Sequence, residues 1–175
     1  FVIETGRVRV FPRLVSAEHR IHMSRDIVKS DSRELDALLG GGVERGSSVL
    51  ILGPAGTGKS LLGLSFVSAA IQRDEKAAMF IFDEEIGLLF SRALGLGIDM
   101  RAMVDSGNLI VEQVDAAELS PGEFSERVRQ CVEHHGVRTI IIDSLNGYQA
   151  SMPEENALIL HMHELLQYLN RQGVT

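Results

Sequence analysis

The sequence has one cysteine, no tryptophan and no long uninterrupted apolar run. A single thiol, Cys131, excludes a disulfide within the chain and suits a reducing compartment, so we expect the protein to act in the cytoplasm. Cys131 lies beside Val128 and Val132 on an expected helix, which predicts a core position. Ser, Gly or a charge interrupts every apolar stretch within about a dozen residues, too few for a membrane-spanning helix, so we expect no membrane partner.

Positive charge is scarce in most of the chain. Residues 1–33 carry seven basic and four acidic side chains, whereas residues 34–175 carry ten basic and twenty acidic ones, and the net charge is −7. The acidic part has no cluster of Lys and Arg interleaved with aromatic residues, the pattern that follows a phosphate backbone. The composition therefore argues against a nucleic-acid partner and makes a recombinase the least favoured function.

The chain of 175 residues is 45% hydrophobic, which suits one domain with a substantial core. Before residue 48 we expect a strand in ETGRVRVFPRLV that ends at Pro12, a linker over 16–32 and a short helix at 35–39. Four continuously apolar segments then alternate with helical patterns. The expected strands are 48–53, 77–83, 108–114 and 138–143, and the expected helices are 60–72, one from the end of the second strand through Leu94, 120–135 and 154–170.

Continuously apolar strands that alternate with helices predict an α/β fold with a mostly parallel sheet and helices on both of its faces. The 120–135 helix has Ser120 as N-cap, Pro121 as first residue and Glu123 to complete a capping box. Because Val174 and Thr175 stand where another strand would begin, we expect the fold to be truncated at its C-terminal side. The chain begins at Phe1 rather than Met, so we expect a fragment of a longer protein.

The segment GPAGTGKS fits the pattern G-x-x-x-x-G-K-[ST] and lies between a predicted buried strand and a predicted helix, as that motif requires. Glycines let the backbone N–H groups wrap around phosphate oxygens, and the helix N-terminus adds a favourable dipole. We expect Lys59 to reach the β- and γ-phosphates of ATP and the Ser60 hydroxyl to bind Mg²⁺. The predicted ATP-binding residues are Gly53, Pro54, Ala55, Gly56, Thr57, Gly58, Lys59, Ser60 and Leu61.

Asp143 ends the apolar run RTIIID, and Asp83 begins the acidic half of FIFDEE. In parallel sheets ligands bind at the carboxyl ends of the strands, where Gly53, Asp83 and Asp143 are all expected. We therefore predict that Asp143 helps Ser60 to hold Mg²⁺ and that Asp83 and Glu84 act on the attacking water. Glu85 is expected to stabilise the start of the next helix. The alternative is that all three acids only stabilise that helix.

In this order the chain carries LDALLGGGVERGS, GPAGTGKS, FIFDEE and IIIDSLNGY, and from about Ser30 to Thr175 it resembles the KaiC branch of the RecA-like P-loop ATPases. The family's paired acids fall on Asp83 and Glu84 when Phe82 is aligned with the aromatic residue before them. A shift by one selects Glu84 and Glu85 instead. Glu84 belongs to both pairs and is the preferred residue for water activation.

The resemblance implies the second of two tandem ATPase modules, with residues 1–29 as the tail of a preceding module plus linker and residues 30–175 as the ATPase domain. It also implies Mg²⁺-dependent ATP hydrolysis within a ring homo-oligomer, a hexamer, that has regulatory protein partners. The family's trans-acting basic residues and its phosphorylation sites would follow Thr175. Two alternatives stay open, namely an ATP-dependent Ser/Thr kinase acting on itself or on a partner, and an ATP-gated assembly scaffold with incidental hydrolysis.

Overall fold

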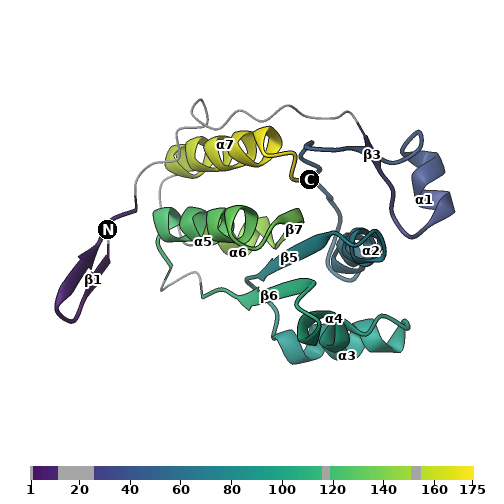
Figure 1. Ribbon diagram of the computed structural model, residues 1–175, viewed down its shortest axis with the longest axis horizontal. Coiled ribbons are helices and arrows are strands. Elements are labelled where there is room, and N and C mark those ends of the chain that lie inside the picture. Colours follow the sequence, from purple (N-terminus) through teal and green to yellow (C-terminus); the bar gives the residue numbers. More distant parts are fainter. Residues whose placement is uncertain (1, 12–25, 116–118, 151–154) are drawn as a thin grey trace.

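The computed structural model describes residues 2–11, 26–115, 119–150 and 155–175 (Figure 1). Its strands are β1 (Val2–Glu4), β2 (Arg7–Arg9), β3 (Ile27–Val28), β4 (Val43–Glu44), β5 (Lys76–Ile81), β6 (Leu109–Gln113) and β7 (Val137–Asp143). Its helices are α1 (Arg33–Leu38), α2 (Lys59–Gln72), α3 (Ile86–Gly95), α4 (Met100–Asp105), α5 (Pro121–Glu133), α6 (Leu145–Ala150) and α7 (Glu155–Arg171). None of the described helices is long and apolar enough to cross a bilayer.

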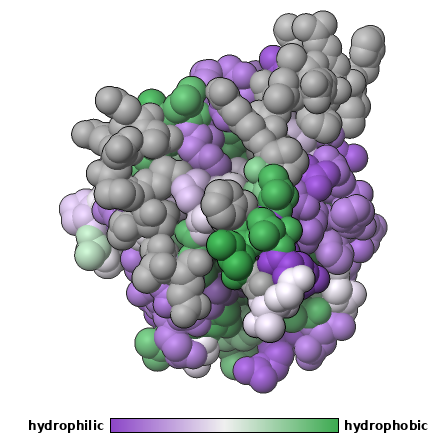
Figure 2. Space-filling model, turned by 90° about the vertical axis from the view of Figure 1, so that its left-hand side faces the viewer, coloured by the Kyte–Doolittle hydropathy of each residue, from purple (hydrophilic) through white to green (hydrophobic). Residues whose placement is uncertain are grey.

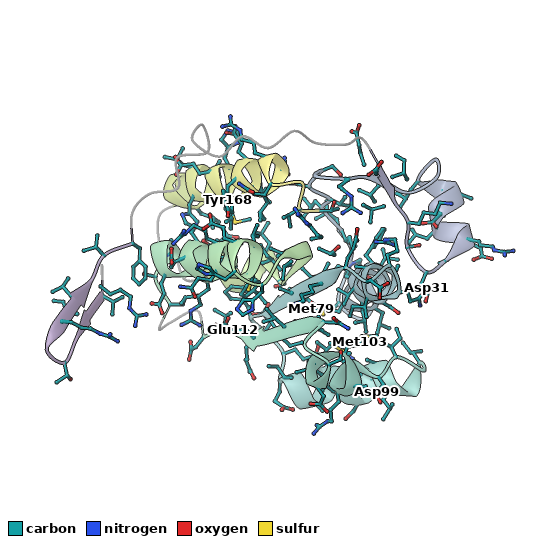
Figure 3. The ribbon with its side chains drawn as sticks, viewed as in Figure 1. Asp31, Met79, Asp99, Met103, Glu112 and Tyr168 are labelled. Carbon is teal, nitrogen blue, oxygen red and sulfur yellow. The ribbon has the colours of Figure 1, made fainter. Side chains whose placement is uncertain are left out.

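The central sheet has the strand order β6-β5-β7, with both pairings parallel. Alternate side chains of β5 enter two separate apolar cores, as the two-residue period of a strand requires. Phe80 packs on α5, α6 and α7, while Met79 packs on α2, α3 and α4. Figure 3 shows Tyr168 of α7 on one side of the sheet and Met103 of α4 on the other. The predicted α/β fold, with helices on both faces of a parallel sheet, is confirmed.

The expected strand at 48–53 is wrong. Residues 47–54 form no strand, and no described strand pairs with them. Val49, Leu50 and Leu52 are 53%, 65% and 82% exposed, although their apolar run had predicted a buried strand. An apolar groove separates this segment from β7, so its backbone has no ladder to join at the spacing of about 4.8 Å that pairing requires.

The N-terminal part differs from the expected single strand and linker. Val2–Glu4 and Arg7–Arg9 form an antiparallel hairpin that stands away from the body of the molecule (Figure 1). Gly6 has a φ of 82°, which allows its tight turn. A second, two-residue pairing of β3 with β4 lies partly inside the expected linker. Residues 16–25 of that linker lie outside the described part of the chain.

The α5 helix begins as predicted, with one difference in its cap. Ser120 is the N-cap and its side chain accepts a hydrogen bond from the backbone N–H of Glu123. The carboxylate of Glu123, however, accepts from Arg127 one turn later rather than completing a capping box. Cys131 is 6% exposed and belongs to the core that α5 shares with β7 and α7, as predicted.

Candidate functional site

The loop Gly53–Gly58 leads into α2, and its shape depends on three glycines. Gly56 and Gly58 have φ values of 80° and 88°, a region in which other residues are strained. A Cβ on Gly53 would lie 2.8 Å from Oγ1 of Thr57. That hydroxyl donates to the carbonyl oxygen of Pro54 at 2.8 Å. The backbone therefore closes on itself into a cradle that side chains at these positions would distort.

Lys59 lies against the loop rather than in open solvent. Its Nζ donates to the carbonyl oxygens of Gly53 and Pro54, both at 2.9 Å. The loop, together with Ile51, Leu52 and Leu62, lines a hollow of about 350 Å³. Lys59 is therefore held against the loop by two backbone carbonyls and contributes to the lining of this hollow.

The start of α2 completes the cradle. Its N-cap, Gly58, offers no side-chain hydrogen bond. The first helical bond runs from the N–H of Leu62 to the carbonyl of Gly58, at 2.9 Å. The N–H groups of Lys59, Ser60 and Leu61 therefore have no acceptor within the helix. Free N–H groups at a helix N-terminus favour an anion such as phosphate.

The carboxyl ends of β5 and β7 lie side by side. Ile81 is opposite Asp143, and the N–H of Phe82 donates to the carbonyl oxygen of Asp143 at 2.7 Å. α2 packs over the same strands: its residues Leu64 and Val67 belong to the same apolar core as Met79 and Ile81. The helix that begins at the phosphate cradle and the two strand ends that carry Asp83 and Asp143 thus belong to one packed unit.

Asp83 is linked to the segment that follows β7. The Ser144 hydroxyl donates to Oδ2 of Asp83 and accepts from the N–H of Gly147 at 3.2 Å. A Cβ on Gly147 would lie 2.6 Å from Oδ1 of Asp83. The sequence interpretation missed Gly147, although a glycine four residues after a strand-terminal acid was a visible signal.

The three acids of FIFDEE have three different partners. The Glu84 carboxylate accepts from Arg92 of α3 at 2.6 Å. The Glu85 carboxylate is the N-cap of α3 and accepts from the N–H groups of Gly87 and Leu88. The prediction that Glu85 serves the helix start is therefore confirmed. Arg92 was missed, because a pairing across two helical turns and a loop gives no pattern in the sequence.

An aromatic cluster packs against the end of β5 at this edge of the sheet. The rings of Phe82 and Tyr148 lie 5.5 Å apart, and those of Phe124 and Tyr148 lie 4.8 Å apart. Burial raises the pKa of the Tyr148 phenol well above its usual value, so the group stays protonated at neutral pH. Tyr148 therefore packs as a neutral ring that holds the end of β5 against α5 and α6.

Figure 2 looks onto the side of the molecule where β6 ends and shows hydrophobic residues gathered among hydrophilic ones.

A glycine cradle that ends in a lysine and a serine at a helix start, set over a parallel sheet, defines a P-loop α/β domain. The family model described as "ATPase: KaiC" matches residues 28–175. The chain therefore belongs to the KaiC family of ATPases, and it contains the ATP-binding module of a P-loop ATPase.

Curated relatives agree with this family. The chain is 28% identical over 151 residues to the circadian clock oscillator protein KaiC of Prochlorococcus marinus, covering 84% of this chain and 29% of that protein. It is 37% identical over 89 residues to the circadian clock protein KaiC3 of Synechocystis sp., covering 50% and 18%. It is 33% identical over 123 residues to the protein RecA of the same organism, covering 70% and 31%. The chain thus spans less than a third of the length of these relatives.

Proposed function

We propose that this module hydrolyses ATP with Mg²⁺ at the Gly53–Ser60 cradle. The observation that carries the proposal is the combination of the closed loop, the free N–H groups that begin α2 and Lys59, which lines the hollow beside them. Backbone N–H groups and a lysine at one point suit the β- and γ-phosphates of a nucleotide. Lys59 would exchange its two carbonyl acceptors for phosphate oxygens.

The chain offers oxygen ligands suited to Mg²⁺ at the same place. Ser60 is the second residue of α2, and Asp143 is the last residue of β7. A hydroxyl and a carboxylate are hard donors of the kind that Mg²⁺ prefers, with phosphate and water completing its shell. When bound, the ion would neutralise charge on the phosphates.

We assign the attacking water to Glu84, with Asp83 beside it. Glu84 is partly buried at the carboxyl end of β5, and Arg92 holds its carboxylate in one position. A carboxylate held in this way could orient water and accept its proton. Asp83, fixed by Ser144, would act at the boundary between β5 and β7.

The test is ATP binding and turnover by Lys59→Ala, with Lys76→Ala as the matched control. Lys76 is an exposed lysine at the start of β5, at the opposite end of that strand from the acids. We expect Lys59→Ala to lower turnover by about 100-fold or more, the effect typical of one lost charge-stabilising group. Lys76→Ala should match the wild type. Equal turnover in the two variants would show that the cradle has no part in hydrolysis.

Two alternative functions of the same site, as a kinase and as an assembly scaffold, can be tested by further measurements. A gain of phosphate on the full-length protein after incubation with ATP would favour the kinase. Assembly that follows nucleotide state while turnover stays negligible would favour the scaffold. Both outputs need the cradle, so Lys59→Ala should abolish each of them.

We also propose that the protein self-associates, as the family resemblance implies, and that the ring is the hexamer expected above. The protruding β1–β2 hairpin supports a larger assembly, since Ile3, Val8 and Val10 are 74%, 59% and 69% exposed. Apolar side chains on an isolated hairpin are usually covered by a partner surface. Light scattering of the full-length protein with ATP, with ADP and with Lys59→Ala tests this, and a monomer under all three conditions would refute it.

A further inference from the structure

A second hollow, of about 530 Å³, lies between α2 and the loop that joins α3 to α4. One wall is the face of α2 that carries Ser65, Ser68 and Gln72, whose spacing of three and four residues places them on one side of the helix. Leu96 and Asp99 of the loop line the other wall. Small-molecule sites have volumes of this order. The hollow shares no lining residue with the Gly53–Ser60 cradle.

Two carboxylates stand in the walls, each on a different element. Asp31 precedes α1, and its Oδ2 accepts from Nε2 of Gln72 at 3.0 Å. Asp99 is the N-cap of α4, and its Oδ1 accepts from the N–H of Ala102 at 3.0 Å. Figure 3 shows both on the same side of the molecule, Asp31 beside α2 and Asp99 at the start of α4. Each carboxylate is thus held in place by one oxygen, and its other oxygen accepts no hydrogen bond from the described residues.

Ser68 gives an independent indication of a ligand. It is 6% exposed, and the surface that it retains lies in the wall of the hollow. A serine within a helix usually donates to a carbonyl about one turn earlier, as Ser65 does to Leu62 at 2.7 Å. Ser68 makes no hydrogen bond with any residue in the described part of the chain. A buried hydroxyl without a partner is unfavourable, so a polar group in the hollow would stabilise it.

The remaining surface suits a cation with an aliphatic body. Leu96 and Met103 add apolar area to the walls. Of the described residues that line the hollow, none is basic. Arg73, directly after α2, donates to the carbonyl oxygen of Lys29 instead. Carboxylates and hydroxyls accept strong hydrogen bonds from ammonium groups, and the twofold excess of acidic residues in 34–175 adds a favourable potential.

We propose that this hollow binds a small aliphatic diamine or polyamine. Asp31 and Asp99 take the ammonium groups, the Ser68 hydroxyl accepts a further N–H, and the methylene chain packs on Leu96 and Met103. Two carboxylates on separate elements with apolar surface between them distinguish such a ligand from a metal ion, which needs its ligands at one point. The proposal uses no residue assigned to ATP, so it stands whether or not the cradle hydrolyses ATP.

The test is calorimetric titration of the full-length protein with diaminopentane, in the absence of nucleotide, beside pentanediol as an uncharged ligand of the same length. We expect the diamine to bind and the diol not to bind. Asp31→Asn and Asp99→Asn should each weaken diamine binding about tenfold, because each removes one charged acceptor. Asparagine is a good N-cap, so Asp99→Asn keeps the start of α4. Asp105→Asn is the matched control, since Asp105 is exposed on α4 outside the hollow and its loss should leave the affinity unchanged.

Ser68→Ala separates a ligand contact from a structural role. It should weaken diamine binding about fivefold, the effect of one neutral hydrogen bond. The melting temperature of the ligand-free protein should not fall, because the Ser68 hydroxyl has no protein partner to lose. A lower melting temperature with unchanged binding would assign the hydroxyl to the fold and overturn the proposal.

Three other results would also overturn the proposal. They are the absence of diamine binding, equal affinity for diamine and diol, and wild-type affinity in both Asp31→Asn and Asp99→Asn. A lysine-rich peptide that binds at these residues when diaminopentane does not would assign the hollow to a protein partner.

Discussion

The two sides of β7 differ in strand pairing and in burial. On one flank β5 pairs along its whole length, and Ala77, Met79 and Phe80 are completely buried. On the other flank Leu52, directly before the phosphate cradle, is 82% exposed and pairs with no described strand. The cradle nevertheless has its closed form, because glycine dihedral angles, the Thr57 hydroxyl and the packing of α2 determine it locally. The geometry of the loop therefore does not depend on strand pairing by the segment that precedes it.

The largest expected effect contrasts a leucine on each side of this difference. Leu64 of α2 is fully buried against Met79 and Leu89, whereas Leu52 is exposed. Leu64→Ala should reduce the free energy of unfolding by about 2–5 kcal/mol through lost burial and a cavity. Leu52→Ala in residues 1–175 should cost less than about 0.5 kcal/mol. Urea denaturation of the two variants measures both values, and equal losses would show that the 48–52 segment is packed in solution.

A smaller effect is expected from removing the cap of α3. Glu85→Ala leaves the N–H groups of Gly87 and Leu88 without their acceptor and should cost about 1 kcal/mol of stability. ATP turnover should stay at the wild-type level, since Glu85 serves only the helix. Thermal unfolding and a turnover assay on the same sample distinguish the two roles. A stable but inactive Glu85→Ala protein would move Glu85 into the site.

The smallest expected effect is the dependence of stability on pH, which involves His161 of α7. Burial lowers the pKa of His161 below its usual 6.5, and its Nε2 lies 3.1 Å from the Ser125 hydroxyl. The unfolded chain therefore binds this proton more readily than the folded one. Stability from this group is complete above about pH 6.5 and falls as the pH drops towards the folded pKa. The change is small because His161 is only partly buried and water screens its charge.

His161→Gln tests this slope against His134→Gln, which changes the exposed histidine at the C-cap of α5. Urea midpoints at about pH 7.5 and about pH 5.5 should differ less in His161→Gln than in the wild type. His134→Gln should keep the wild-type difference. An unchanged slope in His161→Gln would show that the folded protein takes up this proton freely.

The sequence predicted the longer elements that form the central sheet or pack against it. The helix 60–72 and the strands 77–83 and 138–143 are observed as Lys59–Gln72, Lys76–Ile81 and Val137–Asp143. The pattern failed at 48–53, because an apolar run shows that a segment favours burial but not whether a neighbour is there to bury it. Short elements such as β3, β4, α4 and α6 give too few residues for a period to be detected.

The site was predictable to the extent that it is local in the chain. GPAGTGKS forms the closed cradle, and Glu85 caps its helix as expected. The Glu84–Arg92 and Asp83–Ser144 contacts join residues that only the folded chain brings together. The metal and water roles of Ser60, Asp143, Asp83 and Glu84 stay predictions.

The central claim is that the acidic end of β5 performs chemistry, and ATP turnover by Glu84→Gln beside Glu85→Gln tests it most directly. Each change replaces the carboxylate of one of two adjacent residues with an uncharged amide of the same shape. Our account predicts a loss of about 100-fold or more for Glu84→Gln, the typical contribution of a general base, with nucleotide binding retained. Asp83→Asn should give a smaller loss, and Glu85→Gln should keep wild-type turnover. Wild-type turnover in both Glu84→Gln and Asp83→Asn would contradict the account.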